Sequence, residues 1–190
     1  MAGQRKYERE LRARLRDPNR WPGLKVPAFL NRLDGLANKA YLRHTADGAL
    51  AAVLVYHQLV EEMVRLLLQD GQFFVQLAVF PAEIAVAEQK RQMFGQLRQE
   101  LADGLDFPGK RPFLRGIGDL NAIRIEVVHG LARRGNLAGL RRQAKRAQRL
   151  YQRSFWLFSE AHDWFRLSSK DFSKDKFEEW HPRRRGVTSA

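Results

Sequence analysis

Residues 49–68, ALAAVLVYHQLVEEMVRLLL, form the most hydrophobic stretch of the chain. Apolar residues recur there every three or four positions, which places their side chains on one face of an α-helix. The apolar set comprises Leu50, Val53, Leu54, Leu59, Val60, Met63, Val64 and Leu67. The stretch therefore predicts a central core helix, which Asp47 caps and Asp70-Gly71 ends.

Further helical segments are predicted on both sides of this core helix. The expected helices span residues 2–16, 27–43, 83–101, a segment from Pro112 that includes Arg124, and about 136–166, with a short helix or packed loop over 72–80. No segment shows the period-two alternation of a half-buried strand. We therefore expect an all-α bundle of about five or six helices. Residues 1–45 form its basic N-terminal helices, 46–166 its core, and 167–190 a basic, mobile tail.

The composition excludes several classes of protein. The chain has no cysteine, which removes disulfides and thiolate metal sites and fits a reducing cytosol. It shows no secretory signal pattern and no apolar run of about 18 residues. These features predict a cytoplasmic protein that does not span a membrane.

Positive charge is concentrated at the two ends of the chain. The formal net charge is +13, and residues 1–43 and 133–190 together hold 26 of the 34 Lys and Arg residues. Basic ends of this kind suit a polyanion, most often a nucleic acid. The alternative is that Arg-rich helix faces are simply solvated, and the composition alone favours neither interpretation.

The helix expected after Pro112 carries a charged residue on its apolar face. Arg124 falls in the middle of that face, whose other members are Phe113, Ile117, Leu120, Val127 and Leu131. A buried guanidinium needs a partner, so Arg124 should form an ion pair or line a cleft that receives an anion. His129 follows five residues later, roughly 140° around the helix axis. The two side chains could converge at a helix end or across a two-fold axis.

A histidine in the core helix offers a weaker candidate site. His57 and Glu61 stand four residues apart, a spacing that can hold a metal ion, but no third ligand is evident. An ordinary helix-surface pair is the preferred interpretation. We therefore expect neither a metal nor another cofactor.

The order of several short motifs resembles that of the HEPN superfamily of α-helical domains. These motifs are Gly95-Gln96-Leu97, Phe107-Pro108-Gly109-Lys110, Leu120-Asn121-Ala122-Ile123-Arg124 and Val128-His129-Gly130-Leu131. The family signature is an Arg, four to six residues, and then a His on a late helix. The resemblance covers about residues 47–150. At one position the chain departs from it, because Ile125 stands where catalytic members usually carry a polar residue.

The resemblance implies a metal-independent endoribonuclease of the toxin–antitoxin or antiphage type, with its site at a homodimer interface. Arg124 and His129 would be the catalytic residues, and Asn121 and Glu126 would support them. RNA would also contact the basic residues Arg133, Arg134, Arg141, Arg142, Lys145 and Arg146. Two alternatives remain open: a non-catalytic module that binds a nucleotide or RNA, and the helical partner of an antitoxin or nucleotidyltransferase.

Overall fold

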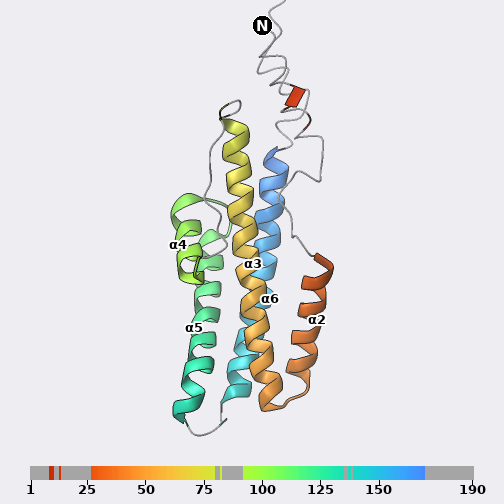
Figure 1. Cartoon of the computed structure of the whole chain (residues 1–190), viewed down its shortest axis with the longest axis vertical. Coiled ribbons are helices and arrows are strands. Elements are labelled where there is room, and N and C mark those ends of the chain that lie inside the picture. Colours follow the sequence, from red (N-terminus) through yellow and green to blue (C-terminus); the bar gives the residue numbers. More distant parts are fainter. Residues whose placement is uncertain are drawn as a thin grey trace, which may run out of the picture.

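The computed structural model describes residues 9, 10, 13, 27–79, 82, 92–134, 137 and 139–169, and within this part of the chain it contains helices and no strand (Figure 1). The long elements are α2 (Pro27–Leu42), α3 (Ala46–Ala78), α4 (Phe94–Gly104), α5 (Lys110–Arg134) and α6 (Leu140–Ser169). The predicted all-α class is therefore confirmed. Most of the helix predicted over 2–16 and of the tail predicted from residue 167 lies outside the described residues.

Helix α3 is the central element of the bundle. It packs against α2, α6, α5 and α4, and α2 and α5 run in the opposite direction to it (Figure 1). Helix α6 runs parallel to α3 along its length, and the short helix α4 packs against both α3 and α5 (Figure 1). One long apolar helix surrounded by four others thus forms the scaffold.

The predicted end of the core helix at Asp70-Gly71 was wrong. Helix α3 continues to Ala78, and both Asp70 and Gly71 are buried within it. A Cβ atom at Gly71 would lie 2.2 Å from Leu105 Cδ2, so the missing side chain leaves room for Leu105 instead of ending the helix. The predicted cap was also wrong. Thr45 is the N-cap, and its hydroxyl accepts a hydrogen bond from the Gly48 amide, whereas Asp47 lies in the first turn.

The number of later helices agrees with the prediction, but the residues at which they begin differ. The helix predicted over 83–101 begins later, because Gln92 and Met93 are not helical and α4 begins at Phe94. Residues 83–91 lie outside the described part of the chain. Helix α5 begins at Lys110, directly after Gly109, whose φ of 79° is readily adopted only by glycine. Helix α6 begins at Leu140, four residues after the predicted position.

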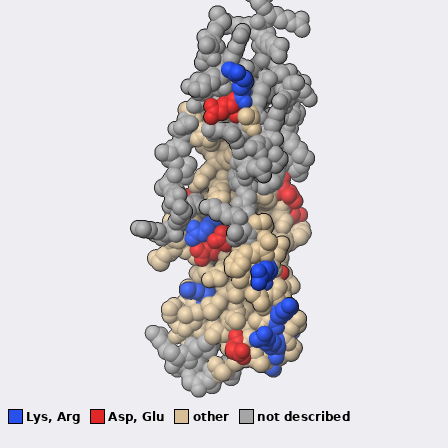
Figure 2. Space-filling view, turned by 45° about the vertical axis from the view of Figure 1, so that its right-hand side comes forward, with Lys and Arg blue, Asp and Glu red and all other residues tan. Residues whose placement is uncertain are grey.

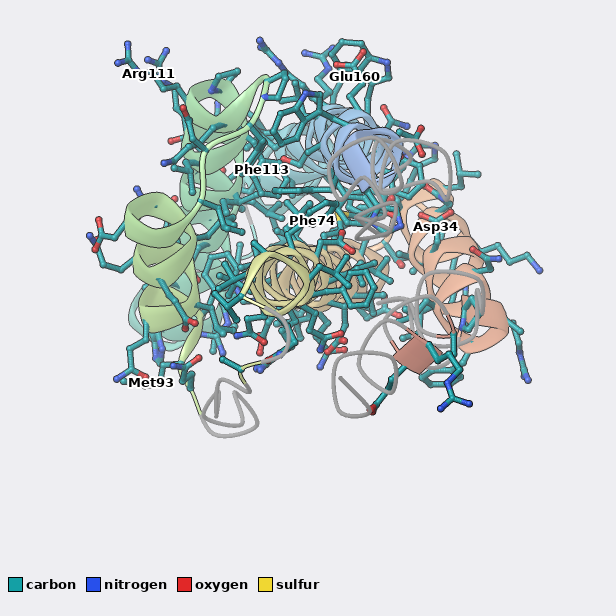
Figure 3. The ribbon with its side chains drawn as sticks, turned by 90° about the horizontal axis from the view of Figure 1, so that it is seen from above. Asp34, Phe74, Met93, Arg111, Phe113 and Glu160 are labelled. Carbon is teal, nitrogen blue, oxygen red and sulfur yellow. The ribbon has the colours of Figure 1, made fainter. Side chains whose placement is uncertain are left out.

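Aromatic side chains fill the half of the bundle in which α3 and α6 end. Phe107 and Phe113 pack edge to face, with ring centroids 6.2 Å apart, and Phe165 lies 5.7 Å from Phe74 and 6.1 Å from Phe107. Figure 3 shows Phe74 and Phe113 pointing into the middle of the bundle, whereas Arg111, Glu160 and Met93 lie at its outside. Burial of such rings supplies a large share of the hydrophobic stabilisation of a small domain.

A polar pair interrupts this aromatic core. His162 Nδ1 on α6 lies 2.5 Å from Asp70 Oδ2 on α3, and the Asp70 side chain is 3% exposed. The His162 ring also stacks on Phe158, with centroids 5.7 Å apart.

No described helix is long and apolar enough to cross a membrane.

Candidate functional site

Ile123, and not Arg124, occupies the buried core position on α5. Ile123 is buried, together with Phe113, Ile117, Leu120 and Val127, and Arg124 lies half-buried at the edge of this face. Successive residues differ by roughly 100° around a helix, so a shift of one position moves Arg124 from the core to its margin. The prediction that Arg124 lies in the middle of the core face was therefore wrong.

The positive charge of Arg124 contributes to lowering the pKa of His57 on α3. Among the described residues, no carboxylate forms an ion pair with Arg124 and no side chain accepts a hydrogen bond from it. A half-buried guanidinium without a counter-charge is a ready site for an external anion.

His57 and Asn121 form the polar contact beside Arg124. His57 Nε2 lies 2.9 Å from Asn121 Oδ1, and because that oxygen only accepts, Nε2–H is the donor. The His57 ring is buried and packs against Phe94 at the start of α4, with centroids 4.7 Å apart. The sequence predicted that His57 pairs with Glu61 on the same helix, so its partner Asn121 on α5 was not predicted.

Burial is the main cause that lowers the pKa of His57 below its ordinary value. The hydrogen bond to Asn121 and the charge of Glu61 act in the opposite direction, whereas the charge of Arg124 adds to the decrease. The imidazole is therefore neutral at pH 7 and serves to hold the Asn121 amide. With Oδ1 occupied, the Nδ2 group of Asn121 remains as a donor one turn from Arg124.

A second guanidinium extends this group of donors onto α4. A Cβ atom at Gly118 would lie 3.3 Å from Arg98 Cζ, so the exposed Arg98 side chain rests on α5 one turn before Asn121. Sequence reasoning did not identify Arg98, because nothing local links it to Gly118. We call Arg98, Asn121 and Arg124 the donor surface.

His129 does not join the donor surface within one protomer. Its side chain is exposed, and it lies on a face of α5 with Ala122 and Ile125, which are also exposed. Ile125 is 44% exposed, a large value for an isoleucine in the middle of a helix. Arg124 and His129 therefore lie on different sides of α5, as their spacing predicts.

The other predicted site residues face α6 or belong to it. Glu126 Oε2 accepts a hydrogen bond from Gln143 Nε2 at 2.8 Å, which directs Glu126 away from Arg124. The first turns of α6 expose four basic residues, Arg141, Arg142, Lys145 and Arg146. Two of them have intramolecular partners: Arg141 donates to the His44 carbonyl oxygen, and Arg146 lies 4.0 Å from Asp119. The side chains of Arg133 and Arg134 lie outside the described residues.

Basic side chains on the face drawn in Figure 2 form separate groups with acidic side chains between them. The described residues of this face therefore form no continuous positive band. Within the described ranges, no group of three His, Cys, Asp or Glu side chains is arranged to hold a metal ion. The weak metal candidate at His57 and Glu61 thus has no third ligand among these residues.

No protein-family model matches the chain, and comparison with curated proteins and with solved structures gave no match either.

Proposed function

We propose that the chain is a metal-independent endoribonuclease of HEPN type that acts as a two-fold dimer. The supporting observation is Arg124 itself, a half-buried guanidinium with no described carboxylate partner and with the Asn121 amide beside it. Arginine and amide donors in this arrangement suit a phosphate, and Arg98 adds a second charge. The basic turns of α6 supply further phosphate contacts.

The proposed reaction uses the nucleophile that RNA already carries. The 2′-hydroxyl oxygen attacks the adjacent phosphorus, the bond from phosphorus to the 5′-oxygen breaks, and that oxygen takes a proton. His129 would accept the 2′-hydroxyl proton or donate a proton to the leaving oxygen, because an imidazole can act as a general base or as a general acid. Arg124 would stabilise the charge that develops on the phosphate oxygens. The products carry a 2′,3′-cyclic phosphate and a 5′-hydroxyl.

A dimer is proposed because one protomer separates the two catalytic groups. Ala122, Ile125 and His129 form an exposed, partly apolar face of α5. In an isologous contact the same face of each chain meets its copy, so residues from both chains can line one cleft. His129 of one protomer would then approach the phosphate that the partner's Arg124 holds.

The test is digestion of several structured and unstructured RNAs in EDTA by the purified full-length chain. Arg124→Gln and His129→Asn should each reduce cleavage by about 100-fold or more, the usual scale for a positioned acid–base or electrostatic group. Arg32→Gln on α2 and His44→Asn are matched controls, because both residues are exposed and lie outside the proposed site. Absence of cleavage by the wild type, or full activity of the double variant, would overturn the enzymatic proposal.

A second candidate function is non-catalytic binding of RNA or a nucleotide, alone or as the helical partner of an antitoxin or nucleotidyltransferase. The observation that favours it is the apolar Ile125 beside Arg124, exposed where a polar residue would orient a substrate. This function predicts RNA binding that Arg124→Gln weakens, no cleavage product, and no effect of His129→Asn.

A further inference from the structure

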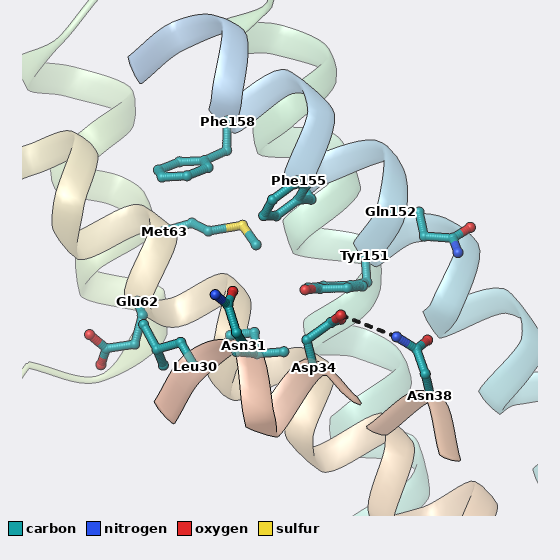
Figure 4. Close-up of a pocket in the computed structure, with 11 residues that line it drawn as sticks. Leu30, Asn31, Asp34, Asn38, Glu62, Met63, Tyr151, Gln152, Phe155 and Phe158 are labelled. Atoms are coloured by element: carbon teal, nitrogen blue, oxygen red, sulfur yellow. Dashed lines mark hydrogen bonds between the residues drawn. The ribbon is translucent and has the colours of Figure 1, made fainter. Parts of the chain in front are cut away.

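A cavity of about 320 Å³ lies between α2, α3 and α6, on the opposite side of α3 from α5. It lies within the range typical of small-molecule sites, at the lower end. Residues from all three helices line it, among them Asp34, Glu62, Met63, Tyr151, Phe155 and Phe158 (Figure 4). None of them belongs to the donor surface, so the cavity is a separate candidate site.

The charge of the cavity is opposite to that of the whole chain. Two carboxylates, Asp34 and Glu62, line it, and no Lys or Arg is among its described lining residues, although the chain carries a net charge of +13. Glu62 has Arg65 Nε at 3.8 Å, whereas no Lys, Arg or His forms an ion pair with Asp34 among the described residues. Asp34 is therefore the uncompensated charge of the cavity.

Neighbouring side chains fix the Asp34 carboxylate in position. Asn38 Nδ2 donates to Asp34 Oδ2 at 3.2 Å (Figure 4). Asn38 is itself held by the Tyr56 hydroxyl, which donates to its Oδ1 at 2.8 Å. Asp34 also contributes to raising the pKa of Tyr151, which lines the same cavity. A carboxylate has about four acceptor positions, so positions beyond the one that Asn38 occupies remain for a ligand.

Two buried tyrosines lie beside Asn38 and Asp34, and the Tyr56 hydroxyl donates to Asn38. Burial raises the pKa of Tyr56 to about 12. Burial, followed by the hydrogen bond and charge of Asp34, also raises the pKa of Tyr151. The rings stack with centroids 4.7 Å apart, which holds the Tyr151 face in place. Both phenols thus stay protonated at neutral pH.

Aromatic and thioether groups form the rest of the wall. Phe155 is 49% exposed, and its centroid lies 6.3 Å from that of Tyr151, whereas Phe158 is buried. Figure 4 shows Met63 extending from α3 toward the rings of Phe155 and Tyr151 on α6. Aromatic faces attract cations, and thioether and aromatic groups pack favourably against the apolar part of a ligand.

We propose that this cavity binds a primary ammonium group carried on a small apolar body. The ammonium would donate to the free acceptor positions of Asp34, and its remaining charge would lie near the faces of Tyr151 and Phe155. The apolar part would contact Met63 and Phe158. The proposal is independent of the ribonuclease activity, because it involves neither Arg124 nor His129.

Calorimetry with three probes of similar shape tests the charge preference in the full-length protein. The probes are 2-phenylethylammonium, neutral 2-phenylethanol and anionic 3-phenylpropanoate. We expect the cation to bind at least tenfold more tightly than either of the others. Non-specific attraction to a chain of net charge +13 would favour the anion instead, so preference for the cation must arise locally.

Substitutions then locate the site. Asp34→Asn, which keeps the shape of the side chain, should weaken binding of the cation about tenfold or more, and Phe155→Leu by a few-fold. Asp106→Asn, at an exposed position outside the cavity, is the control and should leave binding unchanged. Because Phe155 is exposed, its substitution tests the site even where Asp34→Asn alters folding. Absence of cation binding at millimolar concentration, equal binding of the alcohol, or unchanged binding in both variants would overturn the proposal.

Discussion

His57 and Asn121, 64 positions apart in the sequence, join α3 to α5 through a 2.9 Å hydrogen bond. The imidazole is buried, and the amide lies one turn before Arg124. This contact connects the stability of the bundle to the shape of the donor surface, because the same amide serves both.

A double-mutant cycle of His57→Phe and Asn121→Leu should reveal this coupling. Each single variant leaves one partner unsatisfied and should lower the free energy of unfolding by about 1–3 kcal/mol. The double variant should lose less than the sum, with a coupling of about 0.5–3 kcal/mol measured by urea denaturation. The exposed pair of Gln99 and Asp103 on α4 is the control, and its cycle should give a coupling near zero.

The stability of the wild type should fall as the pH is lowered through the range in which His57 titrates. Its folded-state pKa is below the unfolded value of 6.5, so the unfolded chain binds the proton first. This contribution to stability is complete above the unfolded pKa and is lost progressively from about pH 6.5 down to the folded pKa. His57→Phe should remove this component of the pH dependence, as seen in urea midpoints between pH 5 and pH 8. Identical pH profiles for the two proteins would contradict the assignment.

Two glycines in helices should respond oppositely to substitution by alanine. Gly71→Ala places a Cβ 2.2 Å from Leu105 Cδ2 and should destabilise the protein by about 1–3 kcal/mol, with partial rescue by Leu105→Val. Gly35→Ala meets nothing within 4 Å on α2 and should stabilise it by about 0.5–1 kcal/mol. Thermal denaturation of the variants measures both effects, and destabilisation by Gly35→Ala would show that the space at α2 is needed.

The proposed dimer should depend on the exposed apolar face of α5. Ile125→Asp buries a charge in an isologous contact and should convert a dimer to a monomer in light scattering at micromolar concentration. Leu36→Asp, at a residue of α2 that is 57% exposed, is the matched control and should leave the mass unchanged. A wild-type protein that is monomeric under these conditions would argue against the dimer.

RNA binding by the basic turns of α6 should be sensitive to salt. Arg142 and Lys145 are exposed and form no ion pair within the described residues, so Arg142→Gln/Lys145→Gln removes two free charges. The slope of log affinity against log salt should become less steep by about 0.7 for each lost phosphate contact on single-stranded RNA. Fluorescence anisotropy over a salt series measures the slope, and Arg32→Gln/Lys39→Gln on α2 is the control. An unchanged slope in the α6 variant would indicate a solvated surface.

Local sequence signals predicted the helices well where the signals were unopposed. Pro27 and the apolar face after it gave α2 to within one residue of its observed end. They failed at Asp70-Gly71, where a strong breaker signal is overridden by packing, because His162 bonds the carboxylate and Leu105 occupies the space beside the glycine. Such partners are distant in sequence and leave no local trace.

The candidate site shows the same division between local and distant information. The Arg124 and His129 spacing predicted that the two side chains leave α5 in different directions, and the structure places them so. Periodicity could not decide between Ile123 and Arg124 for the core, because both lie within the broad apolar face of a helix. The contacts of His57 with Asn121, and of Tyr56 with Asn38, join separate helices and required the three-dimensional structure.

The pair of Asp70 and His162 also determines how the two longest helices align. Apolar side chains on α3 and α6 tolerate sliding, since one leucine or phenylalanine replaces another at little cost. A shift of one helical turn, roughly 5.4 Å, would separate the carboxylate from the imidazole. Losing this short contact between two largely buried side chains is costly, so shifted alignments are disfavoured. The pair therefore fixes the axial position of 33 residues of α3 against 30 of α6, and with it the walls of the cavity that these helices share with α2.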